Sequence, residues 1–196
     1  QFEEVDLYSQ PFLTERGTIS LTFSQQQDIV DFDLGLVVMR SNWKSPRYQK
    51  PYDSVLEGFE EINDYRSFLF RRMGKYRGFW MPTFEKNMEV VSEDFLIDTI
   101  IVKSISFFDA GEFDFRRNIG LKLKSGAWIF RPILEAISIG SGEFFLQFDT
   151  PINVDAQDIL QVSFLGLHRL NSDAVELEWV GNKVVKATTS IIELTS

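Results

Sequence analysis

The chain contains no cysteine and a single histidine, His168. The absence of cysteine excludes disulfides, thiolate metal sites and a cysteine nucleophile. One histidine rules out a multi-histidine metal site within one chain, and a Ser-His-Asp triad would have to use His168. We interpret His168 as a surface or hydrogen-bonded side chain near a strand end. The sequence therefore predicts no enzyme, no catalytic residue, no metal ligand and no cofactor.

Long hydrophobic runs are also missing. The apolar stretch 34–39 is far too short to span a bilayer, so we expect no membrane insertion. The first four residues, QFEE, are acidic and do not match a signal peptide. They also lack an initial Met, which predicts processing, trimming or a sequence that omits its start.

Basic residues are scarce relative to acidic ones. The 196 residues include 20 Lys and Arg against 29 Asp and Glu, a net charge of −9. An acidic surface opposes binding to phosphate backbones, so we expect no specific nucleic-acid partner. Asp31 and Asp33 would share one strand face, but no calcium-loop motif is present and no carboxylate pair stands out as a glycosidase site. A solvated acidic face is the preferred interpretation.

Aromatic residues are abundant, with 19 Phe, 4 Trp and 5 Tyr. Each buries about 150–250 Å², so the number indicates a large core or extensive interfaces. The length fits one large domain or two smaller lobes. We predict a single unit over 1–196, or two lobes divided as 1–98, strands plus a helix, and 99–196, all β.

The N-terminal half is predicted to contain strands, an ordered loop and one helix. Alternating polarity indicates strands at 18–23 and 30–36. Pro46 and Pro51 predict an ordered loop over 41–56 rather than a helix. Apolar residues at helical spacing predict a helix over about 54–73, with Ser54 and Glu57 as a capping box and Gly74 at its end. The expected buried face consists of Phe59, Ile62, Tyr65, Leu69 and Met73.

The remainder of the sequence is predicted to be mostly β. Residues 78–82 suggest a short edge strand or a docked loop, and 98–102 and 162–167 suggest strands. Hairpins are predicted around Ser125-Gly126 and around 140–142. A further pair, 174–179 and 184–194, turns at Gly181-Asn182. The predicted fold class is mainly β (α+β), an antiparallel β-sandwich or barrel with one main helix at about 54–73.

One basic cluster is interleaved with aromatic residues near the predicted helix end. Its members are Arg66, Arg71, Arg72, Lys75 and Arg77, among Phe70, Tyr76, Phe79 and Trp80. Three interpretations stay open: packing and helix capping, an interface with an acidic protein, and nucleic-acid binding. The acidic balance of the whole chain disfavours the third.

Two stretches resemble tail-tip proteins of long-tailed bacteriophages, of the distal-tail-protein type. The first is WKSPR at 43–47 followed by FLFRRMGKYRGFWMP at 68–82. It resembles a W-x-x-P-R loop, a helix and an R-x-G-(KR)-x-x-(GP)-F-W-x-P pattern. The second, VSFLGLHRLNSDAVELEW at 162–179, resembles a C-terminal segment of related tail proteins. Together the resemblance covers roughly residues 41–85 and 160–194.

The resemblance implies a virion protein, made in the host cytoplasm, that assembles as a homo-oligomeric ring or hub and contacts other tail proteins. Lobe 1–98 would be the ring-forming part. No catalytic residues carry over. In some relatives the Gly-Phe pair is followed by a run like Arg-Phe-Lys-Asp, whereas this chain has Trp80-Met81-Pro82 after Gly78-Phe79. The resemblance therefore does not specify which tail-tip component this chain is. The residues expected in interfaces or packing are Trp43, Arg47, Arg72, Tyr76, Trp80, Arg169 and Trp179.

Two other functions remain as alternatives. A carbohydrate-binding β-sandwich for host attachment would use exposed Trp and Tyr rings as sugar platforms. A cell-wall hydrolase would use paired carboxylates. The first requires a concave face with exposed aromatic rings beside carboxylates, and the second requires two acids whose replacement abolishes turnover.

Overall fold

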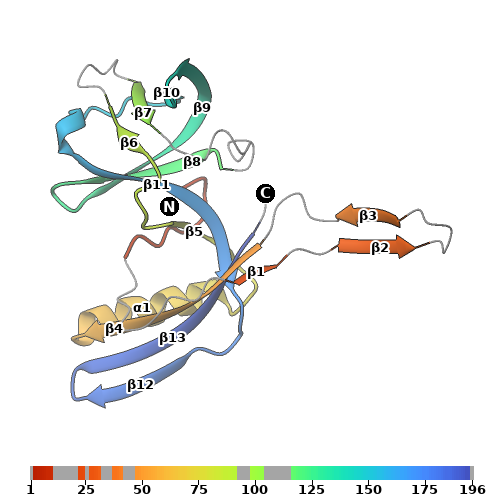
Figure 1. The fold of residues 1–196 in the computed structure, drawn as a ribbon. Helices are drawn as coiled ribbons and strands as arrows, with labels where there is room; N and C mark the ends of the chain where they lie inside the picture. The colour runs from red at the N-terminus through yellow and green to blue at the C-terminus, as the bar shows by residue number, and fades with distance from the viewer. Residues whose placement is uncertain are drawn as a thin grey trace. The chain divides into compact units, whose positions relative to one another are not determined.

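A computed structural model describes residues 2–10, 22–24, 27–31, 37–41, 47–91, 98–103 and 116–194 (Figure 1). Most of these residues lie in antiparallel strands, and the described part of the chain has one α-helix, so the mainly β prediction with a single helix is confirmed. The elements are β1 Thr22–Ser24, β2 Gln27–Asp31, β3 Val37–Ser41, β4 Arg47–Glu57, α1 Phe59–Arg72, β5 Phe79–Pro82, β6 Glu89–Val90, β7 Thr99–Lys103, β8 Asn118–Leu123, β9 Trp128–Gly140, β10 Glu143–Phe148, the 3₁₀ turn η2 Ala156–Asp158, β11 Ile159–Leu170, β12 Glu176–Gly181 and β13 Val184–Glu193.

The chain forms two compact units, each built from separated stretches. Unit 1 comprises Gln1–Ser9 and Trp80–Gly166, and unit 2 comprises Gln10–Phe79 and Leu167–Ser196. The division predicted near residue 98 does not coincide with the boundaries of these units. Strand β11 contributes to both units, because its first part pairs with β8 and its last residues pair with β13.

Unit 1 is a run of antiparallel strands in the order β11-β8-β9-β10-β7-β6. Its two hairpins turn at Ser125-Gly126 and at 140–142, which confirms both hairpin predictions. A bridge between Met88 and Val162 brings the segment before β6 back to β11. The strands thereby enclose an apolar core of Met88, Ile100, Val102, Ile119, Leu121, Ile133, Phe144, Leu146, Phe148, Ile152, Val162 and Phe164.

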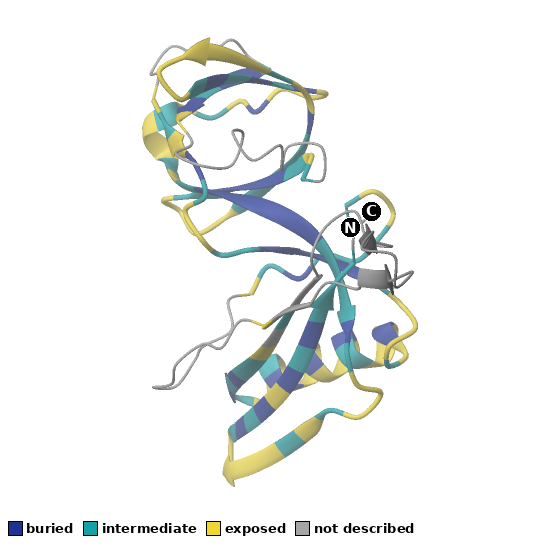
Figure 2. Cartoon of the chain, turned by 45° about the vertical axis from the view of Figure 1, so that its right-hand side comes forward, coloured by how far each residue is buried: buried dark blue, intermediate teal, exposed yellow. Residues whose placement is uncertain are grey.

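Unit 2 is a helix on one face of an antiparallel sheet. β4 pairs with one edge of β13, and β12 and the end of β11 pair with the other edge. Every second residue of β13 is buried from Val185 to Ile191, and Figure 2 shows these bands alternating along the sheet. Tyr65 of α1 shares a 2.5 Å hydrogen bond with Thr189 of β13, which places this alternating face under the helix.

The helix is shorter than predicted, and its start was predicted wrongly. Residues 54–57 belong to β4, where Ser54 is buried and pairs with Ala187. The loop predicted over 41–56 is therefore also wrong for 47–56. The extended ladder between β4 and β13 outweighs the local capping pattern and accommodates Pro51 opposite Ser190.

The buried face of α1 is rotated relative to the prediction. Ile62, Tyr65, Phe68 and Arg72 are buried, whereas the expected core residues Phe59 and Met73 are exposed. At the C-terminus, Met73 has a left-handed backbone with φ 52°, and the predicted left-handed Gly74 follows with φ 65°.

Three further predictions concern shorter segments. All four residues of β5 are buried and the strand pairs with β11, so 79–82 is a strand. The strands predicted at 18–23 and 30–36 lie partly outside the described residues. Within the described part, β2 and β3 pair only with each other.

No described helix combines the length and apolar character needed to cross a membrane.

Candidate functional site

The turn after α1 is organised around a buried arginine. Arg72 is only 3% exposed, and its Nη1 donates a hydrogen bond to the carbonyl oxygen of Gly78. Its guanidinium carbon lies 5.4 Å from the ring centroid of Phe68 and 6.0 Å from that of Phe79. A carbonyl and two ring faces thus compensate the buried charge and tie the end of the helix to the start of β5.

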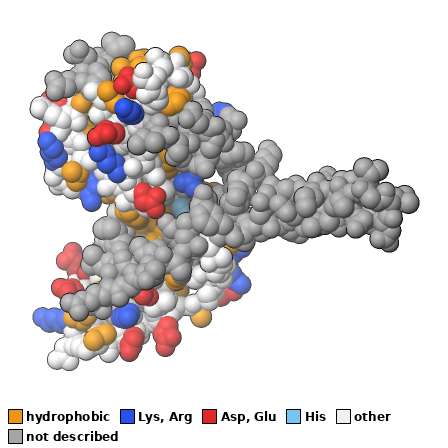
Figure 3. All heavy atoms as spheres, in the orientation of Figure 1, with side chains coloured by type: hydrophobic (Ala, Val, Ile, Leu, Met, Phe, Trp, Pro, Cys, Tyr) orange, Lys and Arg blue, Asp and Glu red, His pale blue; other side chains and the backbone are white. Residues whose placement is uncertain are grey.

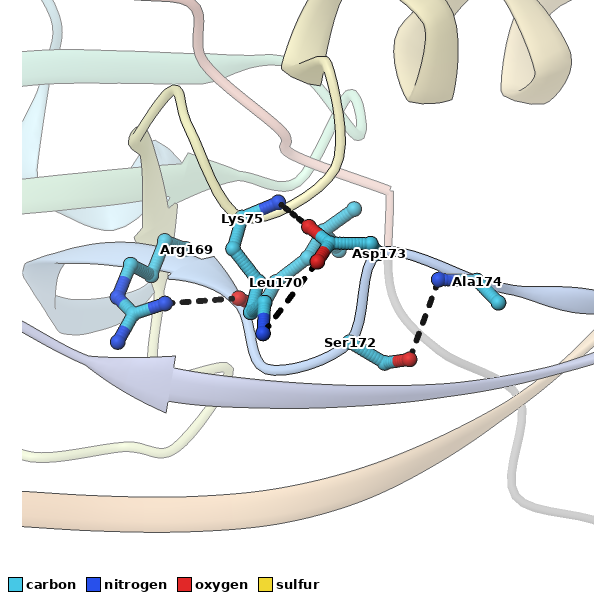
Figure 4. A network of polar contacts seen from close by, with 6 residues as sticks. All are labelled: Lys75, Arg169, Leu170, Ser172, Asp173 and Ala174. Carbon is cyan, nitrogen blue, oxygen red and sulfur yellow. Dashed lines mark hydrogen bonds and ion pairs between the residues drawn. The ribbon is translucent and has the colours of Figure 1, made fainter.

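Asp173 fastens the same turn to the loop after β11. The backbone amide of Lys75 donates to Oδ1 of Asp173 at 2.8 Å, and Nζ of Lys75 lies 3.3 Å from Oδ2 (Figure 4). The backbone hydrogen bond from Lys75 is the main cause that lowers the pKa of Asp173 below its ordinary value. A Cβ on Gly74 would collide with Oδ1 of Asp173, and φ is positive there, so both space and backbone favour glycine.

These contacts join the two stretches that carry the resemblance to tail-tip proteins. Lys75 belongs to the first stretch and Asp173 to the second, 98 positions later. Gly78 lies against the second stretch as well, since a Cβ there would be 3.2 Å from the carbonyl oxygen of His168. Sequence reasoning missed Asp173, because nothing in the local pattern links residues so far apart.

An apolar groove opens beside this junction, and we call it the α1–β12 groove. It has a volume of about 290 Å³. It is lined by Arg66, Leu69, Phe70, Met73, Gly74, Leu170, Asp173, Val175 and Leu177. Phe70 and Met73 on its rim are large, exposed hydrophobic residues. In Figure 3 hydrophobic side chains lie among charged ones on the visible described surface.

The groove exists because the sheet is wider than its helix. A helix about 10 Å wide covers roughly two strands spaced about 4.8 Å apart. Leu177 and Trp179 of β12 pair with Ala187 and Val185, so their side chains point to the helix side of the sheet. Trp179 nevertheless remains 55% exposed, so α1 leaves this side of β12 partly uncovered.

Three of the residues expected in interfaces or packing are involved in packing. Arg72 is the buried arginine described above. Trp80 is buried in β5, with the ring of Phe2 set edge-on at a centroid distance of 5.7 Å. Arg169 is half-buried, and its Nη1 donates to the carbonyl oxygen of Leu170 at 3.5 Å.

The other expected residues are exposed or lie outside the described part. Tyr76 is 82% exposed in the turn after α1, and Trp179 is exposed on β12. Arg47 is the first residue of β4, but its side chain lies outside the described part of the structure, and Trp43 lies outside it altogether. The structure therefore brings Arg72 and Arg169 into one unit with the exposed Tyr76 and Trp179.

A row of aromatic rings in unit 1 was not predicted. Trp128 and Phe130 on β9 are stacked with centroids 5.8 Å apart, and Phe84 sets its ring edge against Trp128 at 6.0 Å. Gly120 on the neighbouring strand leaves space for them, since a Cβ there would lie 2.9 Å from the Phe130 ring. The rings are half-buried and pack on one another, as structural rings do.

No metal-binding group of three or more His, Asp or Glu residues occurs among the residues that the structure describes. His168 is half-buried on β11, with its ring centroid 6.3 Å from that of Phe79. A scan against protein-family models and a search of curated proteins each found no match.

Proposed function

We propose that this chain is a structural subunit of a bacteriophage tail tip, of the distal-tail or baseplate kind. It assembles into a ring or hub and joins neighbouring tail proteins. The observation that carries the proposal is the junction in unit 2. The two stretches that resemble tail-tip proteins fasten to each other through Lys75 and Asp173, and an apolar groove lies beside them.

The exposed hydrophobic residues of unit 2 support an assembly role. They are Phe59, Phe70, Met73, Tyr76, Trp179 and Val180. Phe70 and Met73 lie together at the α1–β12 groove. Contiguous apolar surface on a protein marks interaction sites, and aromatic residues are enriched in interface hot spots. A subunit that buries these side chains against neighbours accounts for their exposure in the separate chain.

The net charge of −9 fits the same role. It keeps the free subunit soluble in the host cytoplasm before assembly into the virion. It also disfavours adhesion to the DNA that passes through a tail, because adhesion to phosphates depends on Lys and Arg. A subunit of this kind works through its surfaces and requires no cofactor or catalytic residue.

Gene disruption with complementation tests the proposal. We expect phage that lack the gene to accumulate heads and incomplete tails, and a plasmid copy of the gene to restore infectious particles. Arg72→Ala, which disturbs the fold, should fail to complement, whereas Arg71→Ala at the exposed neighbouring position should succeed. Normal infectious particles in the absence of the gene would contradict the proposed function.

A further inference from the structure

The last turns of α1 and the turn that follows it carry a concentration of positive charge. Residues 65–78 contain five of the chain's 20 Lys and Arg residues and no Asp or Glu. Of these five, Arg66 lines the α1–β12 groove, and its side chain is exposed. Asp173, the acidic residue in the groove lining, is already held by Lys75. The groove therefore favours an occupant that combines apolar side chains with carboxylates.

The first turn of α1 has this composition. Phe59 is exposed, and Glu60 beside it is also exposed. Asp64, one turn later, is exposed too. The helix is thus acidic with an exposed aromatic residue at one end, and basic with exposed apolar residues at the other.

We propose that the α1–β12 groove is a docking site for a second copy of this chain, which inserts the first turn of its own α1. Phe59 of one copy fills the groove between Met73 and Leu177 of the next, and Glu60 faces Arg66. The two patches lie at different ends of the helix, so the contact is head-to-tail, the kind that generates a ring when the rotation between copies closes. This inference rests on the ring assembly in the proposed function and names the surfaces that form it.

The area beside the groove suits such a contact. Phe70 and Met73, which line the groove, are exposed, and so is Trp179, which lies two residues beyond the groove residue Leu177 on the helix side of β12. A stable interface needs an apolar centre with large side chains, surrounded by polar groups that exclude water. The groove lined by Leu69 and Leu177 supplies the centre, and Arg66, which also lines it, supplies a charged group at its side.

Sedimentation velocity of the purified chain over a range of concentrations and NaCl levels tests this inference. We expect the 22.7 kDa chain to form a larger species that dissociates as salt rises. Met73→Glu should weaken association by about tenfold or more, since it places a charge in the apolar centre. The matched control is Leu134→Glu in unit 1, because Leu134 is 59% exposed and Met73 is 60% exposed. This control should associate like the wild type.

A charge swap tests the occupant. Glu60→Arg and Arg66→Glu should each weaken association, and the double variant should recover most of it, since the two charges meet between copies. Circular dichroism verifies that each variant is folded. Association of Met73→Glu equal to that of the control would overturn the groove as the docking site, and a double variant without recovery would overturn the first turn of α1 as its occupant.

The wild-type result separates this inference from the proposed function. A chain that sediments as a monomer at all concentrations overturns docking between copies, whereas the proposed function is decided by the phage experiment. Defective tails in the gene disruption together with a monomeric chain would leave the tail-tip role standing and remove this interface.

Discussion

Replacing Arg72 by Ala removes the buried connection between α1 and β5. The change deletes a hydrogen bond from a charged donor to Gly78, worth about 1.5–3 kcal/mol. It also deletes ring contacts to Phe68 and Phe79, worth about 0.5–1 kcal/mol each. Allowing for the desolvation of a buried guanidinium, we expect a loss of about 3 kcal/mol in the free energy of unfolding. Arg71 is exposed, so Arg71→Ala should change it by less than about 0.5 kcal/mol.

Urea unfolding followed by circular dichroism measures the difference between these two variants. Hydrogen exchange of the α1 amides reports unit 2 separately, and Arg72→Ala should accelerate exchange there more than Arg71→Ala does. Arg72→Lys keeps a charge but loses the planar guanidinium, so we expect an intermediate loss of about 1–2 kcal/mol. Equal stability of the two alanine variants would refute the structural role assigned to Arg72.

Three further predictions use the same unfolding assay. Gly120→Ala should cost about 1–3 kcal/mol, because its Cβ would lie 2.9 Å from the Phe130 ring, and an unchanged urea midpoint would contradict that packing. Tyr65→Phe should cost about 1–3 kcal/mol by leaving the buried hydroxyl of Thr189 without its partner, and adding Thr189→Val should recover part of the loss. Burial raises the pKa of Tyr65 above its ordinary value. The contribution of Tyr65 to the free energy of unfolding is therefore complete below the unfolded pKa of about 10 and is lost as pH rises through the folded pKa. Tyr65→Phe should flatten this decline of stability at alkaline pH. The pKa of Asp173 is lowered, so its contribution to the free energy of unfolding is present above the unfolded pKa of about 3.9 and is lost as pH falls through the folded pKa. Asp173→Asn should flatten this decline of stability at acid pH. An unaltered dependence of stability on acid pH would contradict the prediction.

Local sequence signals predicted the two hairpins of unit 1. Ser125-Gly126 lies between apolar runs of strand length, and Gly126 has the positive φ of 88° that such a turn uses. The left-handed Gly74 was likewise predictable from its position after a basic helix end. These features depend on residues that are close in sequence.

Features that depend on distant pairing were not predictable. Ser54 and Glu57 form a convincing capping pattern, but the ladder between β4 and β13 draws them into a strand. Phe59 has the spacing of a core residue but is exposed, because the buried face of α1 runs through Ile62, Tyr65 and Phe68. The α1–β12 groove depends on where β12 lies relative to the helix, which no local pattern records.

Mass spectrometry of gradient-purified phage particles, combined with immunogold labelling, tests the tail-tip assignment most directly. We expect several copies of this chain per particle, with label at the tail end far from the head. Particles that are complete and infectious but contain no peptide of this chain would contradict it.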